Sequence, residues 1–174
     1  MDVLIAQPVL ETARLTLRPH QKSDTGLISL YSSDLRVARM TASIPHPNPP
    51  GAVEAFMAFV AKSNDASMNW TIDATRGYGC EVVGAIGIDS DGSLGYWLGP
   101  FFWNLGIATE AVGALSDFAR KADYPRLSAG VFQENPASRR VLEKNGFEVN
   151  HESTQFCVAQ NKTVQTWEMI DGRP

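Results

Sequence analysis

The sequence contains little cysteine and little histidine. Its 174 residues include two cysteines, Cys80 and Cys157, and three dispersed histidines, His20, His46 and His151. Their spacing matches neither a zinc site nor a CxxC redox motif. We therefore expect a cytoplasmic protein with reduced thiols, and we expect no bound metal.

The chain also lacks an excess of positive charge and any long hydrophobic run. Its net charge of −4 disfavours a nucleic-acid-binding surface. No stretch approaches the roughly 18 apolar residues that cross a membrane, and the opening MDVLIAQPVLETARL lacks the basic region of a signal peptide. A hydrophobic fraction of 44% instead predicts one globular domain, residues 1–174, with no nucleic-acid or membrane partner.

The hydrophobic pattern alternates between the periods of strands and helices. Strands are predicted at 14–18, 68–74, 80–88, 93–99 and 126–132, followed by a final hairpin around Asn161–Lys162. Helices are predicted in short pieces across 23–40, at 53–60, at 107–122 and from Asn135 to Gly146, with a proline-rich connector at 44–51. The strands 93–99 and 126–132 flank a helix, so they would lie parallel within one mixed sheet.

The stretch FFWNLGIATEA, residues 101–111, leads from a strand into a helix through Gly106. The first N–H groups of a helix have no intrahelical partner, and the helix dipole is positive there. Gly106 and Ala108 place almost no side chain at this end, so a phosphate could approach the backbone closely. A purely structural tight turn is the alternative interpretation, because small residues are common at such turns.

The stretch NPASRRVLEKNGF, residues 135–147, has Asn135 and Pro136 as a typical helix start. Arg139 and Arg140 lie in its first turn, where the helix dipole disfavours positive charge. Either Glu143, one turn further along, or a bound anion such as phosphate could compensate.

The stretch LGYWLGP, residues 94–100, contains glycines at 95 and 99 and ends on Pro100. These residues disfavour regular pairing along the whole strand, so it is predicted to splay or bulge. A strand that leaves its neighbour exposes N–H and C=O groups to an extended ligand rich in amides. Alternatively, its aromatic residues serve the hydrophobic core alone.

Three of these stretches together resemble the RimJ/RimL-like branch of the GNAT superfamily, the acetyl-CoA-dependent N-acetyltransferases. ETARLTLRP, GYWLGPFFWNLGIATEA and NPASRRVLEKNGFE match its motifs in order, from about residue 11 to 149. The resemblance implies an α+β fold in three α/β/α layers. Its sheet would be strongly twisted, splayed, mixed and mostly antiparallel, with six to seven strands and coenzyme A bound in the splayed cleft.

The resemblance also implies roles for individual residues. The loop from Trp103 to Thr109 would bind the pyrophosphate through backbone amides, and the strand Tyr96–Leu98 would pair with the pantetheine amides. Ser138 would protonate the leaving thiolate, although its hydroxyl could equally bond the backbone of its own helix. The implied cofactor-binding residues are Tyr96, Trp97, Leu98, Trp103, Asn104, Leu105, Gly106, Ile107, Ala108, Thr109, Asn135, Ser138 and Arg139.

Two departures from the family pattern concern the cofactor and the catalytic base. Asn104 and Leu105 stand where the family has Gly and Lys, which predicts weaker cofactor binding. Ser93 stands where the branch often has a carboxylate. The sequence therefore leaves the general base open: Glu81, Asp89, Asp91 and Glu110 are the nearby acids, and His46 lies in the proline-rich connector.

The acceptor is predicted from the cost of deprotonating an amine. At pH 7 an α-amine costs about 1.4 kcal/mol to neutralise, whereas a lysine-like amine costs about 4.6 kcal/mol. A site with a poor base thus favours the α-amine of a protein N-terminus or small molecule. A polyamine or aminoglycoside acetyltransferase, and a non-catalytic CoA-binding sensor, are the alternatives. The sequence is compatible with a monomer or a homodimer.

Overall fold

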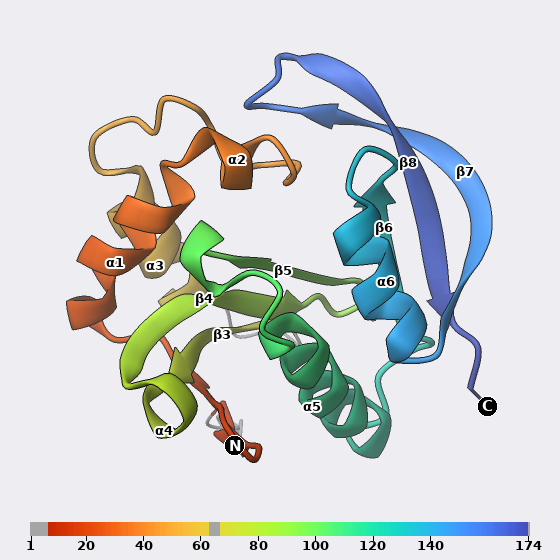
Figure 1. Cartoon of the computed structure of the whole chain (residues 1–174), viewed down its shortest axis with the longest axis horizontal. Helices are drawn as coiled ribbons and strands as arrows, with labels where there is room; N and C mark the ends of the chain where they lie inside the picture. The colour runs from red at the N-terminus through yellow and green to blue at the C-terminus, as the bar shows by residue number, and fades with distance from the viewer. Residues whose placement is uncertain (1–6, 63–66, 174) are drawn as a thin grey trace.

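The structure is a computed structural model that describes residues 7–62 and 67–173. Its sheets have five strands in the order β1-β2-β3-β4-β5 and three in the order β6-β8-β7 (Figure 1). The strands are β1 Leu10–Glu11, β2 Thr16–Pro19, β3 Met68–Ala74, β4 Cys80–Ile88, β5 Leu94–Leu98, β6 Ser128–Phe132, β7 Phe147–Cys157 and β8 Lys162–Asp171. The helices are η1 Lys22–Asp24, α1 Thr25–Ser32, α2 Leu35–Ala38, α3 Ala52–Lys62, α4 Thr75–Tyr78, η2 Pro100–Phe102, α5 Ile107–Lys121 and α6 Pro136–Lys144.

The main core lies between the sheets and the helices α5 and α6. The apolar stripe of α5, which includes Ile107, Val112 and Leu115, is buried against Trp70 and Ile72 of β3. These residues recur at the spacing of one helix face, which is why the sequence predicts this helix well. A smaller cluster covers the opposite side of the larger sheet, where α1 and α3 pack (Figure 1).

The two sheets meet at a single point and then diverge. Ser93 and Ser128 form an isolated parallel bridge between the starts of β5 and β6. Beyond this bridge each strand pairs only on its other side, β5 with β4 and β6 with β8. The predicted splayed, mixed and mostly antiparallel arrangement is confirmed, together with the parallel orientation of these two strands. The described residues form eight strands in two sheets, whereas six to seven strands in one sheet were predicted.

The far ends of the two halves touch again at the top of the molecule in Figure 1. There the turn between β7 and β8 reaches the segment that follows α2. Val158 donates its backbone N–H to the Ala42 carbonyl at 3.0 Å, and the thiol of Cys157 lies 3.2 Å from the Thr41 carbonyl oxygen. These contacts bridge the gap between the sheets on one side.

Three local features differ from the sequence prediction. The short β1 and α4 were not predicted, because two and four residues are too few for a period to be visible. Strand β7 begins at Phe147, earlier than predicted. Its first half is polar and exposed, so it lacks the alternation of apolar and polar residues from which a strand is predicted. Among the described residues, no helix has the length and apolar character needed to cross a membrane.

Candidate functional site

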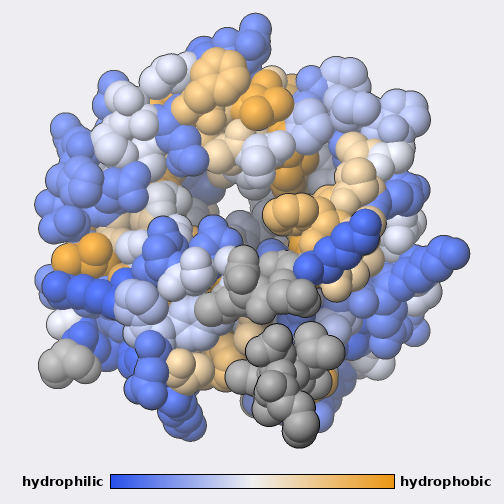
Figure 2. Space-filling model, turned by 180° about the vertical axis from the view of Figure 1, so that it is seen from behind, coloured by the Kyte–Doolittle hydropathy of each residue, from blue (hydrophilic) through white to orange (hydrophobic). Residues whose placement is uncertain are grey.

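A cleft of about 1490 Å³ lies where β5 and β6 separate. Its walls come from β5, β6 and the first turns of α5 and α6, and from α1, α3 and the loop between them on the other side. Figure 2 shows the molecule hollowed at its centre on the face opposite to that of Figure 1. The cleft therefore combines an exposed strand edge with two helix N-termini.

The first turn of α5 has unused backbone donors. Gly106, the N-cap, has a φ of 76°, and Asn104 two residues earlier has a φ of 60°. Glycine adopts this left-handed backbone freely, and asparagine tolerates it better than most residues. Gly106 has no side chain to cap the helix, and the N–H groups of residues 107–109 have no acceptor within the described part of the chain. This helix start can therefore bind an anion.

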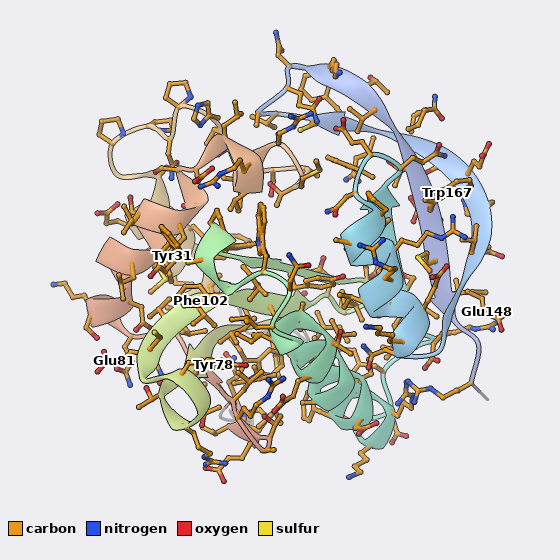
Figure 3. The ribbon with its side chains drawn as sticks, viewed as in Figure 1. Tyr31, Tyr78, Glu81, Phe102, Glu148 and Trp167 are labelled. Atoms are coloured by element: carbon orange, nitrogen blue, oxygen red, sulfur yellow. The ribbon has the colours of Figure 1, made fainter. Side chains whose placement is uncertain are left out.

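The loop before α5 is held from behind by one arginine. Arg14 donates to the Leu105 carbonyl at 3.0 Å, to the Glu110 carboxylate at 2.7 Å and to the Tyr78 hydroxyl at 2.6 Å. Figure 3 shows Tyr78 below this loop. Burial opposes the charge of Glu110, but hydrogen bonds from Thr12 and Arg14 outweigh it and lower the pKa of this carboxyl. Glu110 is thus used to position the loop.

A second support fixes the wall of the cleft. The indole Nε1 of Trp103 donates to the Leu98 carbonyl at 2.9 Å, which ties the loop to the end of β5. Tyr31 of α1 packs edge-on against Phe102, with ring centroids 5.6 Å apart (Figure 3). Both contacts hold the loop's backbone in place without covering the N–H groups of α5.

Tyr96 and Ser138 face one another across the cleft. Their hydroxyl oxygens are 2.7 Å apart, and the Tyr96 hydroxyl also lies 3.2 Å from the Ser138 carbonyl. Burial raises the pKa of Tyr96 to about 12, with the Ser138 hydrogen bond acting in the opposite direction. Tyr96 therefore remains a neutral phenol at neutral pH. The alternative that the Ser138 hydroxyl only bonds the backbone of its own helix is not seen, because this hydroxyl contacts Tyr96 instead.

The helix α6 starts as the sequence predicts, but Arg140 and not Arg139 lies at the cleft. Asn135 accepts the backbone N–H of Ser138 at 3.2 Å and so caps the helix. Arg139, which was expected to flank the cofactor, does not line the cleft: it pairs with Glu143 at 2.8 Å and stacks on Trp167 at 5.2 Å. Arg140 lines the cleft in its place.

Lys144 follows Arg140 by one helical turn, and both line the cleft. The next residue, Asn145, donates from its side chain to the Thr109 carbonyl at 3.1 Å, which ties the end of α6 to the first turn of α5. Neither cation has an acidic partner within the described residues. The uncapped end of α5 thus has two unpaired cations on the neighbouring helix.

Of the cofactor-binding residues that the resemblance implied, two do not line the cleft. Leu105 lies in the loop with its carbonyl bound to Arg14, and Arg139 is engaged by Glu143 and Trp167. The cleft is lined by the others, Tyr96, Trp97, Leu98, Trp103, Asn104, Gly106, Ile107, Ala108, Thr109, Asn135 and Ser138. The structure therefore brings together residues that span about forty positions of sequence.

Comparison with known proteins identifies the fold around this cleft. Residues 14–148 match the family model described as the acetyltransferase (GNAT) domain. The chain belongs to the GNAT family of N-acetyltransferases.

Proteins that are similar to this GNAT protein in sequence or in fold carry different names. The uncharacterized N-acetyltransferase YoaA of Bacillus subtilis is 29% identical over 149 residues, which cover 81% of this chain and 83% of YoaA. RimL, a ribosomal L7/L12 α-N-protein acetyltransferase solved with coenzyme A, has a TM-score of 0.75 at 16% identity, covering 94% of this chain and 98% of RimL. The spermidine N-acetyltransferase of Vibrio cholerae, solved with CoA and spermine, has a TM-score of 0.73 at 14% identity, covering 92% and 97%.

The acids considered as a base for this GNAT protein are mostly outside the cleft. Glu81, Asp91 and Glu110 do not line it, and neither does His46, whose Nδ1 lies 3.1 Å from the Ser33 carbonyl oxygen. Asp89 lines the cleft and is solvent-exposed at the end of β4. The described part of the chain adds one acid that the sequence did not indicate, Glu168 of β8.

Nothing local in the sequence indicates Glu168 or Lys144 as residues of the cleft, and for the pair Arg139 and Arg140 a bound anion was one of two alternatives. Glu168 belongs to the alternating polar residues of a C-terminal strand, and Arg140 is adjacent to an arginine that points elsewhere. The helical spacing of Arg140 and Lys144 could have placed them on one face, but only the packing of α6 shows which face it is. No cluster of three metal-ligating side chains occurs among the described residues.

Proposed function

We propose that this GNAT protein transfers an acetyl group from acetyl-CoA to the α-amine of a protein N-terminus or a small molecule, as RimJ/RimL-like enzymes do. The observation that carries the proposal is the pair of hydroxyls of Tyr96 and Ser138, 2.7 Å apart in the same cleft as the uncapped start of α5. A proton donor and an anion-binding helix end therefore share one cavity.

The residues present fit the diphosphate of coenzyme A. The free N–H groups at the start of α5 would bind its oxygens, and Arg140 and Lys144 would supply positive charge in place of the lysine that Leu105 replaces. The free edge of β5 would pair with the pantetheine amides. Bound acetyl-CoA supplies a thioester, which a neutral amine attacks to form an amide as the carbon–sulfur bond breaks.

Ser138 would give its hydroxyl proton to the departing sulfur and regain a proton from water. Tyr96 would hold the serine oxygen in place from the opposite wall, because its phenol stays protonated and can donate to it. A positioned proton donor of this kind contributes about 10²–10⁴-fold to a rate.

The charges of the cleft support an α-amine over a polyamine or an aminoglycoside. The described lining contains two acids, Asp89 and Glu168. Of its four cations, Arg36 and Arg39 pair with Asp34 and Glu134, and Arg140 and Lys144 would bind the diphosphate. A polycation needs several carboxylates to offset the loss of its hydration, whereas a single α-ammonium group requires only one carboxylate. The similarity to RimL in fold is compatible with this acceptor class, and the similarity to the spermidine enzyme shows that fold alone does not decide it.

A thiol-release assay with acetyl-CoA tests the proposal. The acceptor panel contains peptides with free N-termini, the same peptides with blocked N-termini, free amino acids, spermidine and an aminoglycoside. We expect release of CoA thiol with free α-amines and none with blocked peptides. Faster release with spermidine or the aminoglycoside would overturn the acceptor class, and calorimetric CoA binding without any release would favour the sensor.

A further inference from the structure

Glu168 places a carboxylate at the narrow end of the cleft. It lies opposite Gly130 in the register of β8 and β6, and both residues line the cleft. A Cβ atom at position 130 would be 3.5 Å from Oε1 and 3.6 Å from Oε2 of Glu168. Because residue 130 is glycine, no side chain of β6 lies between its Cα atom and the Glu168 carboxylate.

The position along the strands relates Glu168 to the gap. The bridge between Ser93 and Ser128 is the last pairing of β5 with β6. Gly95 and Gly130 come two residues after the bridge on their own strands, so they flank the gap where it begins, and both line the cleft. The Glu168 carboxylate, above Gly130, is therefore at the start of the gap.

Glu168 and Ser138 approach the gap from opposite faces of the smaller sheet. Trp167 and Met169, the neighbours of Glu168, face α6: the first stacks under Arg139 and the second is buried in the core with Leu142. Side chains alternate along a strand, so Glu168 faces the other way. A group held in the gap would have the serine hydroxyl of α6 on one side and the carboxylate on the other.

The hydrogen bonding of Glu168 leaves one oxygen available. Ser153 of β7 donates its hydroxyl to Oε1 at 2.7 Å, which orients the carboxylate. No positively charged side chain pairs with Glu168 within the described residues. This contrasts with Glu110, whose oxygens are occupied by Thr12 and Arg14. Oε2 of Glu168 is thus free to accept a proton from a ligand or a hydrogen bond from its ammonium group.

We propose that Glu168 is the general base of the reaction and the group that binds the acceptor amine. This rests on the proposed function. As the amine nitrogen forms its bond to the acetyl carbon, Glu168 takes one proton from that nitrogen, directly or through one water, and later releases it to solvent. Ser138 gives a proton to the leaving sulfur, so the sum is amine plus thioester giving amide plus thiol.

The pair Glu168→Gln and Glu152→Gln tests the role of the carboxylate. Glutamine keeps an oxygen that can accept from Ser153, so E168Q should fold normally. Glu152 lies on the same hairpin, opposite Trp167 and outside the cleft, which makes E152Q a control for the same loss of charge. We expect E168Q to lower kcat/KM about 10²-fold, with E152Q unchanged.

Calorimetry gives a readout that does not need turnover. An α-amino peptide titrated into CoA-saturated protein should bind about tenfold more weakly to E168Q than to wild type, while CoA itself binds equally to both. Gly130→Ala should lower kcat/KM at unchanged CoA affinity, because its methyl group would lie against both carboxylate oxygens at ordinary contact distance.

The outcomes separate the two proposals. An active wild type with an E168Q variant of unchanged kcat/KM and amine affinity would overturn the role of Glu168 and leave the proposed function standing. A wild type that binds CoA and peptide without thiol release would overturn the activity, and reduced peptide binding by E168Q would still support the contact. A wild type that binds no CoA would overturn both.

Discussion

The phenol oxygen of Tyr96 lies 2.7 Å from the hydroxyl oxygen of Ser138, which joins a strand to a helix 42 residues later. Tyr96 belongs to the aromatic strand that forms one wall of the cleft, and Ser138 belongs to the first turn of α6. The side chain that we assign to proton donation is therefore held by the same strand that would pair with the cofactor.

This pair predicts a specific kinetic hierarchy. Ser138→Ala should lower kcat about 10²-fold, because it removes the proton donor. Tyr96→Phe should lower kcat several-fold, since it removes one hydrogen bond worth about 1 kcal/mol. The double variant should be no slower than S138A, because Tyr96 acts through Ser138. Steady-state kinetics of the four proteins check this, and additive losses would contradict it.

The neighbouring arginines of α6 predict opposite effects on cofactor affinity. Arg140→Met should weaken CoA binding about tenfold, since Arg140 lines the cleft and has no acidic partner among the described residues. Arg139→Met should leave the affinity unchanged, because Arg139 is bound to Glu143 and Trp167. Calorimetric titration with CoA at two salt concentrations measures both. Equal losses in the two variants would show that this assignment of the helix faces is incorrect.

Two glycines on adjacent strands predict different effects on stability. A Cβ atom at Gly84 would lie 2.1 Å from the Trp97 carbonyl oxygen, so Gly84→Ala would force β4 and β5 apart. We expect the free energy of unfolding to fall by about 3 kcal/mol. Gly95→Ala meets nothing within 4 Å and should be nearly neutral for folding. Urea denaturation of both variants gives the comparison, and similar midpoints would contradict it.

A buried ion pair predicts how stability depends on pH. The two terminal guanidinium nitrogens of Arg18 each lie 2.9 Å from an oxygen of Asp24, which is 2% exposed. Burial opposes the charge of Asp24, but hydrogen bonds from Arg18, Gln21 and Thr71 together outweigh it and lower its pKa. Asp24→Asn should cost about 3 kcal/mol at pH 7, because Arg18 loses a buried partner.

The sign of that dependence follows from the lowered pKa. The ionised form of Asp24 stabilises the folded state fully above the unfolded pKa of about 3.9, and this contribution is lost as pH falls through the lower folded pKa. Chemical denaturation at pH 7, 5 and 3 should therefore show a constant difference between wild type and D24N from pH 7 to 5, which shrinks at pH 3. A difference that grows toward low pH would refute the assignment.

Much of the fold is predictable because its signals are local. The stripe on α5 repeats at the helical period, Asn135 and Pro136 start α6, and the glycines around Tyr96 and Trp97 predict a strand that splays, as β5 does from β6 while its pairing with β4 stays regular. The α4 turn carries no comparable signal, since four residues bury too little to leave a pattern.

Only the part of the candidate site that is formed by one continuous segment of the chain was predictable from the sequence. The loop from Trp103 to Thr109 is such a case, because Gly106 leaves a helix end without a side-chain cap. The face of α6 was not, since adjacent arginines look equivalent in sequence while packing on Trp167 sends Arg139 away from the cleft.

The sequence by itself determined the longer periodic elements, the family motifs and the uncapped start of α5, because these depend on side-chain period and on backbone conformations that few residue types allow. Only the tertiary structure decided that Glu168 meets Gly130, that Tyr96 reaches Ser138 and that Arg140 lines the cleft. These contacts depend on the register of the strands, on the divergence of the two sheets and on the rotation of α6 about its axis. All three result from packing between segments that are distant in the chain.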